Sequence, residues 1–336
     1  MTRRALVLFG LMSLVWGIPY LFIRIAVAEI PPAVLVFART GLAAVILLPV
    51  ALLRTDLRPV LARWRWLLAF AAAEIAVPWI LLASAEQQLT SSLAGLLVAG
   101  VPLVGTVIAV ATRARHHVSG RNGLGLLVGL VGVAAIVGVD LQVSNALAIG
   151  EVGLVVVGYA IGPAILARPL AGLPSLGVMA LSLSASALVY APIAALERPA
   201  SVPSAGAVLA VVILAVVCTA VAFLLFAALI EAIGPVRSTV ITYVNPAVAA
   251  LLGVGVLHEP LTVGMAVGFG LVIAGSVLAT ASPTSGPATA SVASGAAATE
   301  QPAGLDEAEL AAALAAEHGV PVAIERRPPV VDESRA

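Results

Sequence analysis

The stretch RSTVITYVNPAVAALLGVGVLHEPLT, residues 237–262, is apolar enough to lie in lipid, yet Asn245-Pro246 interrupts its first half and His258-Glu259-Pro260 ends it. Proline has no amide N–H, so it leaves the carbonyl four residues earlier without its helical donor. In a bilayer, a neighbouring helix, a hydroxyl group or cavity water must satisfy that carbonyl. The break therefore implies a membrane helix that has a polar or protein partner at this point.

The composition excludes a soluble domain. Hydrophobic residues make up 61% of the 336 residues, charged residues only 10%, and the mean hydropathy is +1.13. An average soluble domain has roughly a quarter charged residues. Apolar runs of about 20 residues recur, and each is long enough to cross about 30 Å of hydrocarbon as a helix. We therefore predict an all-α polytopic membrane protein.

Breaks rich in charge, proline or glycine separate ten predicted transmembrane helices. They cover residues 5–25, 32–53, 66–85, 91–112, 122–141, 148–168, 173–195, 205–230, 236–257 and 262–281. With the N-terminus inside, the predicted inner loops collect eleven arginines and the outer loops only Arg198. Cytoplasmic loops are enriched in Arg, so this bias predicts a multi-pass protein of the cell membrane with both termini in the cytoplasm.

An internal repeat relates the two halves of the chain. The segment LAGLLVAGVPLVGTVIAV, residues 93–110, aligns with residues 237–254 so that Pro102 coincides with Pro246. Gly125 and Gly132 likewise align with Gly268 and Gly275, and Trp16 aligns with Tyr159. A repeat of five spans necessarily inverts the second copy, and inverted repeats are a recurrent architecture of secondary transporters.

The repeat divides the chain into three predicted regions. Residues 1–142 and 148–282 are the two five-helix repeats, and residues 283–336 form an acidic cytoplasmic tail that starts in a Pro/Gly/Ser/Ala/Thr-rich segment. Such a segment cannot bury enough apolar area to fold, so we expect the tail to be disordered. The tail also contains LDEAELAAALAAEHG, so a short helix that binds a partner is the alternative to a fully disordered tail.

Several of these segments resemble the EamA family of the drug/metabolite transporter superfamily. The similar segments are WGIPYLFIRIA, VFARTGLAAVILL, ASAEQQLTSSLAGLLVAGVPL and GFGLVIAGS, together with the long block at 218–262. The resemblance implies ten helices in two inverted repeats and the transport of small metabolites. In the family, an acidic residue usually ends the fourth span. In this sequence Arg115 occupies that position, whereas Glu259 occupies the corresponding position in the second half.

Ionisable residues inside the spans are functional candidates by default. Arg39 lies about 10 Å below the outer start of its helix, and Glu74 about 12 Å above the inner start of the next. Two long side chains at these depths can meet, so we expect Arg39 and Glu74 to approach each other or to share a central cavity. Two interpretations are open. Arg39 and Glu74 form a structural ion pair, or they act in transport, where Arg39 binds a substrate carboxylate and Glu74 couples transport to protons.

Helix breaks and neighbouring side chains supply the other candidates. Trp16, Tyr159, Tyr243 and Asn245 are predicted to line the cavity, and Pro19, Pro102 and Pro246 to break or gate their helices. Pro78 and Pro163 are interpreted as packing kinks, and Arg24, Glu86 and Glu231 as interfacial anchors or gate-rim residues.

Export of amino acids or similar compounds by alternating access, without enzymatic activity, is the function that the family resemblance favours. A channel-like permease, an intramembrane enzyme and a membrane sensor remain alternatives. The expected partners are a small metabolite, the lipid bilayer and, as a coupling ion, the proton; a homodimer is open. Neither nucleic acid nor a cofactor is expected. No metal site is expected either, because Cys218 is the one cysteine and His116-His117 lack acidic companions.

Overall fold

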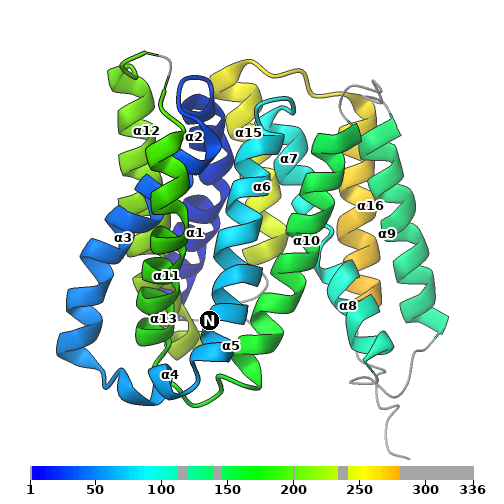
Figure 1. The fold of residues 1–336 in the computed structure, drawn as a ribbon. Coiled ribbons are helices and arrows are strands. Elements are labelled where there is room, and N and C mark those ends of the chain that lie inside the picture. The colour runs from blue at the N-terminus through cyan, green and yellow to red at the C-terminus, as the bar shows by residue number, and fades with distance from the viewer. Residues whose placement is uncertain (1, 113–119, 139–145, 200, 234–240, 281–336) are drawn as a thin grey trace, which may run out of the picture. The chain divides into compact units, whose positions relative to one another are not determined.

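The fold described here is that of a computed structural model, which describes residues 2–112, 120–138, 146–199, 201–233 and 241–280 (Figure 1). The described part consists of helices joined by turns and short loops and contains no strand. Predictions for Arg113, Arg115, His116-His117 and the tail at 283–336 lie outside the described residues.

The helices follow the predicted apolar segments. The first half contains α1 (Arg3–Gly17), α2 (Pro19–Val27), α3 (Pro32–Arg54), α4 (Arg58–Ala62), α5 (Trp64–Phe70), the π-helical segment η1 (Ala71–Ala76), α6 (Val77–Ala85), α7 (Ser91–Val98), α8 (Val101–Ala111) and α9 (Gly120–Gly138). The second contains α10 (Ala146–Ala167), α11 (Ser175–Leu196), α12 (Ala205–Ala215), the π-helical segment η3 (Val216–Val221), α13 (Ala222–Ile233), α15 (Ile241–Leu257) and α16 (Val263–Thr280).

Nine continuous helical stretches in the described ranges are long and apolar enough to cross a membrane, and α15 adds a tenth, shorter apolar helix of 17 residues. The predicted all-α polytopic fold is therefore confirmed. The predicted boundaries differ from the observed ones by a few residues, because helix ends depend on local capping. The α4 helix, between the second and third spans, was not predicted.

Two of the three prolines predicted to break or gate their helices lie where one helical segment gives way to the next. Pro19 separates α1 from α2, and α7 ends at Val98 just before Pro102 opens α8. The prediction is wrong for Pro246, which lies inside the continuous α15 helix. A proline removes one donor and can kink a helix, but neighbouring groups that satisfy the backbone allow the helix to continue.

Equivalent helices of the two halves pack against each other. The second spans, α3 and α11, are in contact, and so are the fifth spans, α9 and α16 (Figure 1). The first span of each half instead packs against the third and fourth spans of the other: α1 against α13 and α15, and α10 against α6 and α8. This reciprocal packing buries an extensive interface between the two halves.

Glycine allows α9 and α16 to approach closely. A Cβ atom on Gly132 would lie 2.6 Å from the amide nitrogen of Val272, and one on Gly125 would lie 2.4 Å from that of Ala279. A Cβ atom on Gly275 would likewise lie 2.3 Å from the amide nitrogen of Gly129. The prediction that the paired glycines permit close helix packing is confirmed.

Candidate functional site

Arg39 lies on α3 at the contact between the two halves. Its side chain is only 6% exposed, and its Nε donates a hydrogen bond of 3.1 Å to the hydroxyl of Thr219 in η3. The guanidinium carbon lies 3.6 Å from the centre of the Trp79 ring, in cation–π geometry. Arg39 therefore binds one residue from each half of the chain.

Both third spans carry a π-helical segment at matching positions. Glu74 belongs to η1 and Thr219 belongs to η3. The Thr219 hydroxyl also donates to the carbonyl of Leu214, five residues earlier, at 2.8 Å. Single π-helical turns widen a helix locally and frequently occur at functional sites. Here they place a carboxyl group and a hydroxyl group in the interior of the bundle.

Glu74 does not pair with Arg39 in this structure. Its carboxyl group lies against Gly162 of α10, where a Cβ atom would be only 2.0 Å from Glu74 Oε2. Oε2 is closed off from solvent and has no hydrogen-bond partner among the described residues. Tyr159 of α10 packs against the apolar cluster that contains Trp79, the residue on which the Arg39 guanidinium group lies.

These residues form one central polar cluster, which we define as Arg39, Glu74, Trp79, Tyr159 and Thr219. Tyr20 of α2 borders the cluster and interacts electrostatically with Arg39 and Tyr159. The cluster thus assembles side chains from α3, η1, α6, α10 and η3. It provides a guanidinium group, a carboxyl group, two hydroxyls and an indole ring, of which the guanidinium group is the one suited to a negatively charged partner.

The other predicted cavity residues, Trp16, Tyr243 and Asn245, lie on α1 and α15. Trp16 packs on α13, with its ring centre 6.4 Å from that of Phe223 and 4.8 Å from that of Phe226. Tyr243 is half-buried on α15. The Asn245 amide is oriented here so that its nitrogen and its oxygen both have suitable partners. In this orientation Nδ2 donates to the carbonyls of Ile241, at 2.9 Å, and Ser13, at 3.1 Å. Asn245 therefore ties α15 to α1.

A second polar arrangement joins the two halves beyond the end of α15. Glu259 is 9% exposed, and its carboxylate accepts four hydrogen bonds from Ser91 and Ser92 at the start of α7. Oε1 accepts from the Ser91 amide and hydroxyl at 2.8 and 3.0 Å, and Oε2 from those of Ser92 at 2.9 and 2.6 Å. We call Glu259, Ser91 and Ser92 the Glu259 clamp.

The backbone before Glu259 is shaped to deliver its carboxylate. His258 adopts a φ of 56°, in the left-handed region, and the Glu259 amide donates to the carbonyl of Gly253 at 3.1 Å. A Cβ atom on Gly253 would lie 2.2 Å from the Ser92 hydroxyl oxygen and 2.3 Å from Glu259 Oε2. The clamp therefore requires glycine at this position.

Glu86 lies near the clamp at the end of α6. It is fully buried, and neither carboxyl oxygen has a hydrogen-bond partner among the described residues. It interacts electrostatically with Glu259, Arg24 and Arg39, and Arg24 donates to its backbone carbonyl. The predicted role of Glu86 as an interfacial anchor is wrong, because the carboxyl group points into the protein.

Sequence reasoning missed Thr219, Ser91 and Ser92, because they are small polar residues in apolar surroundings with no motif of their own. Glu259 carried a signal, as the acidic residue that the first repeat lacks. Among the described residues no group of His, Cys, Asp and Glu side chains could hold a metal ion.

Comparison with known proteins places this architecture in a family. The EamA-like transporter family matches the chain twice, over residues 3–138 and 149–281. The uncharacterized inner membrane transporter YedA of Escherichia coli (strain K12) is 30% identical over 299 residues, covering 83% of this chain and 92% of YedA. YedA of Escherichia coli O157:H7 gives the same values. One solved crystal structure matches with a TM-score of 0.60 at 21% identity, covering 83% of this chain and 98% of the other.

These matches define a polytopic membrane transporter. The chain belongs to the EamA-like transporter family of the drug/metabolite transporter superfamily, as the sequence resemblance predicted.

Proposed function

We propose that this chain exports small metabolites that carry a carboxylate, such as amino acids, from the cytoplasm by alternating access. In this proposal residues 1–142 and 148–282 are two inverted repeats that move against each other, and both termini face the cytoplasm. The central polar cluster is the substrate site, and the Glu259 clamp closes the outer end of the pathway. Inverted-repeat transporters hold their substrates near the bilayer midplane between the repeats.

The placement of Arg39 carries the proposal. A buried guanidinium group is costly unless it is paired, yet its partners here are a neutral hydroxyl and an indole ring rather than a carboxylate. A guanidinium group has five N–H donors, and the bond to Thr219 uses only the donor on Nε. The Nη donors can therefore bind a substrate carboxylate in a bidentate manner.

Substitution of Arg39 tests the substrate site. Arg39→Gln removes the charge, and Arg39→Lys keeps it without the bidentate geometry. In proteoliposomes loaded with a labelled panel of amino acids and other carboxylates, we expect both variants to lose most transport, with Arg39→Gln the more severe. Arg198→Gln, at an exposed position, is the matched control. Wild-type transport by Arg39→Gln would contradict the proposal.

Glu74 is the proposed proton-coupling residue. Ionised carboxylates are costly to bury without partners, so a closed-off and unpartnered carboxyl oxygen is a candidate for carrying a proton. Glu74 belongs to the same central polar cluster as Arg39, so its protonation can respond to substrate binding there. Glu74→Gln should make transport insensitive to an imposed pH gradient. An unchanged response of this variant to the gradient would remove Glu74 from this role.

A further inference from the structure

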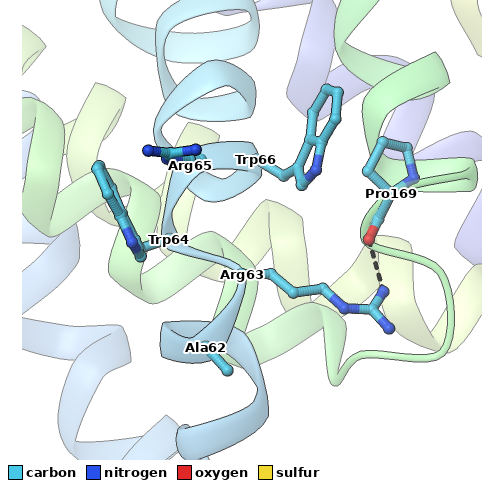
Figure 2. Close-up of a pocket in the computed structure, with 6 residues that line it drawn as sticks. All are labelled: Ala62, Arg63, Trp64, Arg65, Trp66 and Pro169. Atoms are coloured by element: carbon cyan, nitrogen blue, oxygen red, sulfur yellow. Dashed lines mark hydrogen bonds between the residues drawn. The ribbon is translucent and has the colours of Figure 1, made fainter.

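A hollow of about 460 Å³ lies where the third span begins (Figure 2). One wall is residues 62–66, which comprise the end of α4, Arg63 and the start of α5, and the other is Pro169, just after α10. The hollow lies at the end of the bundle that contains α4, opposite the connection between α15 and α16 (Figure 1). In the predicted orientation this end faces the cytoplasm.

Arg63 connects the two walls of the hollow. Its Nη1 donates to the carbonyl of Pro169 at 2.5 Å, and Figure 2 shows the extended side chain between them. The side chain is exposed, and the remaining guanidinium donors are available to a ligand. The bond to Pro169 holds the guanidinium group in place, so a ligand does not have to order a free side chain.

Trp64 and Trp66 lie on either side of Arg65 in the sequence and expose 54% and 50% of their surface. The Arg65 guanidinium carbon lies 5.5 Å from the centre of the Trp64 ring, whereas Trp66 extends toward Pro169 (Figure 2). Tryptophan is enriched at the membrane–water interface, where its ring lies at the level of the lipid headgroups. Leu61 and Leu68, which precede and follow this segment in the sequence, are also exposed, by 52% and 45%.

The charge around the hollow is positive. Arg54, Arg58 and Arg168 lie in the same predicted inner loops. Among the described residues of these loops, the acidic residue is Asp56. Asp56 accepts a hydrogen bond from the backbone amide of Arg58. The described contacts of Arg63 and Arg65 are with a carbonyl oxygen and an indole ring rather than with carboxylates. Their charges are therefore available to an anion.

We propose that this hollow binds the phosphate group of an anionic phospholipid. Arg63 and Arg65 bind the phosphate, Trp64 and Trp66 border the headgroup, and the acyl chains extend along the apolar surface beside Leu61 and Leu68. Basic pockets between transmembrane helices on the cytoplasmic side suit such headgroups. The exposed leucines favour a lipid over a soluble phosphate compound, because a soluble compound gains nothing from apolar surface beside its site.

Native mass spectrometry of the full chain tests the site. The purified protein is released from nanodiscs of phosphatidylcholine with and without phosphatidylglycerol, and the retained lipid is measured. We expect wild-type protein to retain phosphatidylglycerol selectively. Arg65→Gln leaves the bond between Arg63 and Pro169 intact and should weaken retention about fivefold, and Arg63→Gln/Arg65→Gln should weaken it further. Arg198→Gln, an exposed arginine at the opposite end of the bundle, is the control and should retain lipid like wild type.

Two outcomes would overturn the proposal. The first is equal retention by wild type and by the double variant while both give the same thermal unfolding midpoint in detergent. The second is a rise in the unfolding midpoint with inorganic phosphate that equals the rise with short-chain phosphatidylglycerol and is lost in Arg65→Gln, because that result assigns the site to a soluble anion. Neither result depends on transport, so the site can fail or stand independently of the proposed export function.

Discussion

Glu259 shows what a single residue contributes to the junction between the two halves. Its carboxylate receives four donors from Ser91 and Ser92 and lies at the N-terminus of α7, where the helix dipole favours negative charge. Glu259→Gln replaces one acceptor oxygen by an NH₂ group, which then faces two donors. Hydrogen bonds to charged groups contribute about 1.5–3 kcal/mol each. We therefore expect the substitution to lower the free energy of unfolding by about 2 kcal/mol.

Thermal unfolding in detergent measures this effect. The matched control is Glu197→Gln, because Glu197 is an exposed glutamate at the C-terminal cap of α11. A lower unfolding midpoint for Glu259→Gln than for Glu197→Gln is the expected result. Equal midpoints would show that the clamp does not stabilise the protein.

Single residues also show where sequence reasoning reached its limit. An arginine and a glutamate inside apolar spans were evident from the pattern, but their partners were not, because contacts between distant spans depend on helix rotation. Arg39 therefore bonds to Thr219 instead of Glu74. Asn245 was predicted to line the cavity, and its amide bonds to carbonyls of α15 and α1, contacts that the sequence did not indicate.

At the scale of elements, the glycine contacts between α9 and α16 have a clear energetic consequence. A Cβ atom on Gly132 would meet the backbone of α16, which cannot move without shifting the whole helix. Gly132→Ala should therefore destabilise the protein by about 1–3 kcal/mol, the usual cost of overpacking. Thermal unfolding checks this, with Gly138→Ala in the same helix as control, because a Cβ atom there has nothing within 4 Å. A neutral Gly132→Ala would contradict the close packing.

Glu29 stabilises the start of another element. The hydroxyl and amide of Ser204, the N-cap of α12, donate to its carboxylate at 2.7 and 2.6 Å, and these bonds hold the pKa of Glu29 below its ordinary value of 4.5. A depressed folded-state pKa means that the ionised carboxylate stabilises the fold above the ordinary pKa. This contribution is lost as the pH falls through the folded-state pKa.

Comparing unfolding midpoints from neutral pH down to about pH 3 tests this linkage, since carboxylates titrate near pH 4. Wild type should be more stable than Glu29→Gln at neutral pH, and the difference should shrink as the pH falls below about 4.5. Glu197→Gln should follow the wild-type profile. A difference that stays constant with pH would rule out the linkage.

The π-helical segments η1 and η3 are elements that the sequence did not reveal. Pro78, which the sequence pattern led us to interpret as a packing kink, is the second residue after η1. No proline accompanies η3, whose residues are VVCTAV. A widened turn depends on tertiary contacts, such as the bond from the Tyr190 hydroxyl to the carbonyl of Ala76 at 2.9 Å. Hydrophobic periodicity over a short window does not contain that information.

At the scale of the whole molecule, the architecture could be predicted from the sequence more reliably than the contacts within the site. Ten apolar segments and an odd-numbered repeat predicted the all-α membrane fold, because lipid leaves few options for a spanning backbone. The reciprocal packing of the first spans, α1 and α10, on the opposite halves places the central polar cluster where the halves meet. Motion of one half against the other would therefore alter this cluster and the clamp together.

Cys218 reports on such a motion without any engineered label. It is the one cysteine of the chain, 2% exposed, and adjacent to Thr219 in the central cluster. In wild-type protein we expect a membrane-impermeant maleimide added from the side of the α15–α16 connection to modify Cys218 slowly. If the clamp holds that end closed, the loss of about 2 kcal/mol expected for Glu259→Gln raises the labelling rate about thirtyfold.

The controls separate opening of the pathway from general unfolding. Cys218→Ser must abolish labelling, and Glu197→Gln should label at the wild-type rate. Labelling of Glu259→Gln from the opposite side should rise less, because only one end of the pathway is released. Equal acceleration from both sides would indicate loosening of the whole bundle, and an unchanged rate would show that the contact between Glu259 and the start of α7 does not control access to the centre.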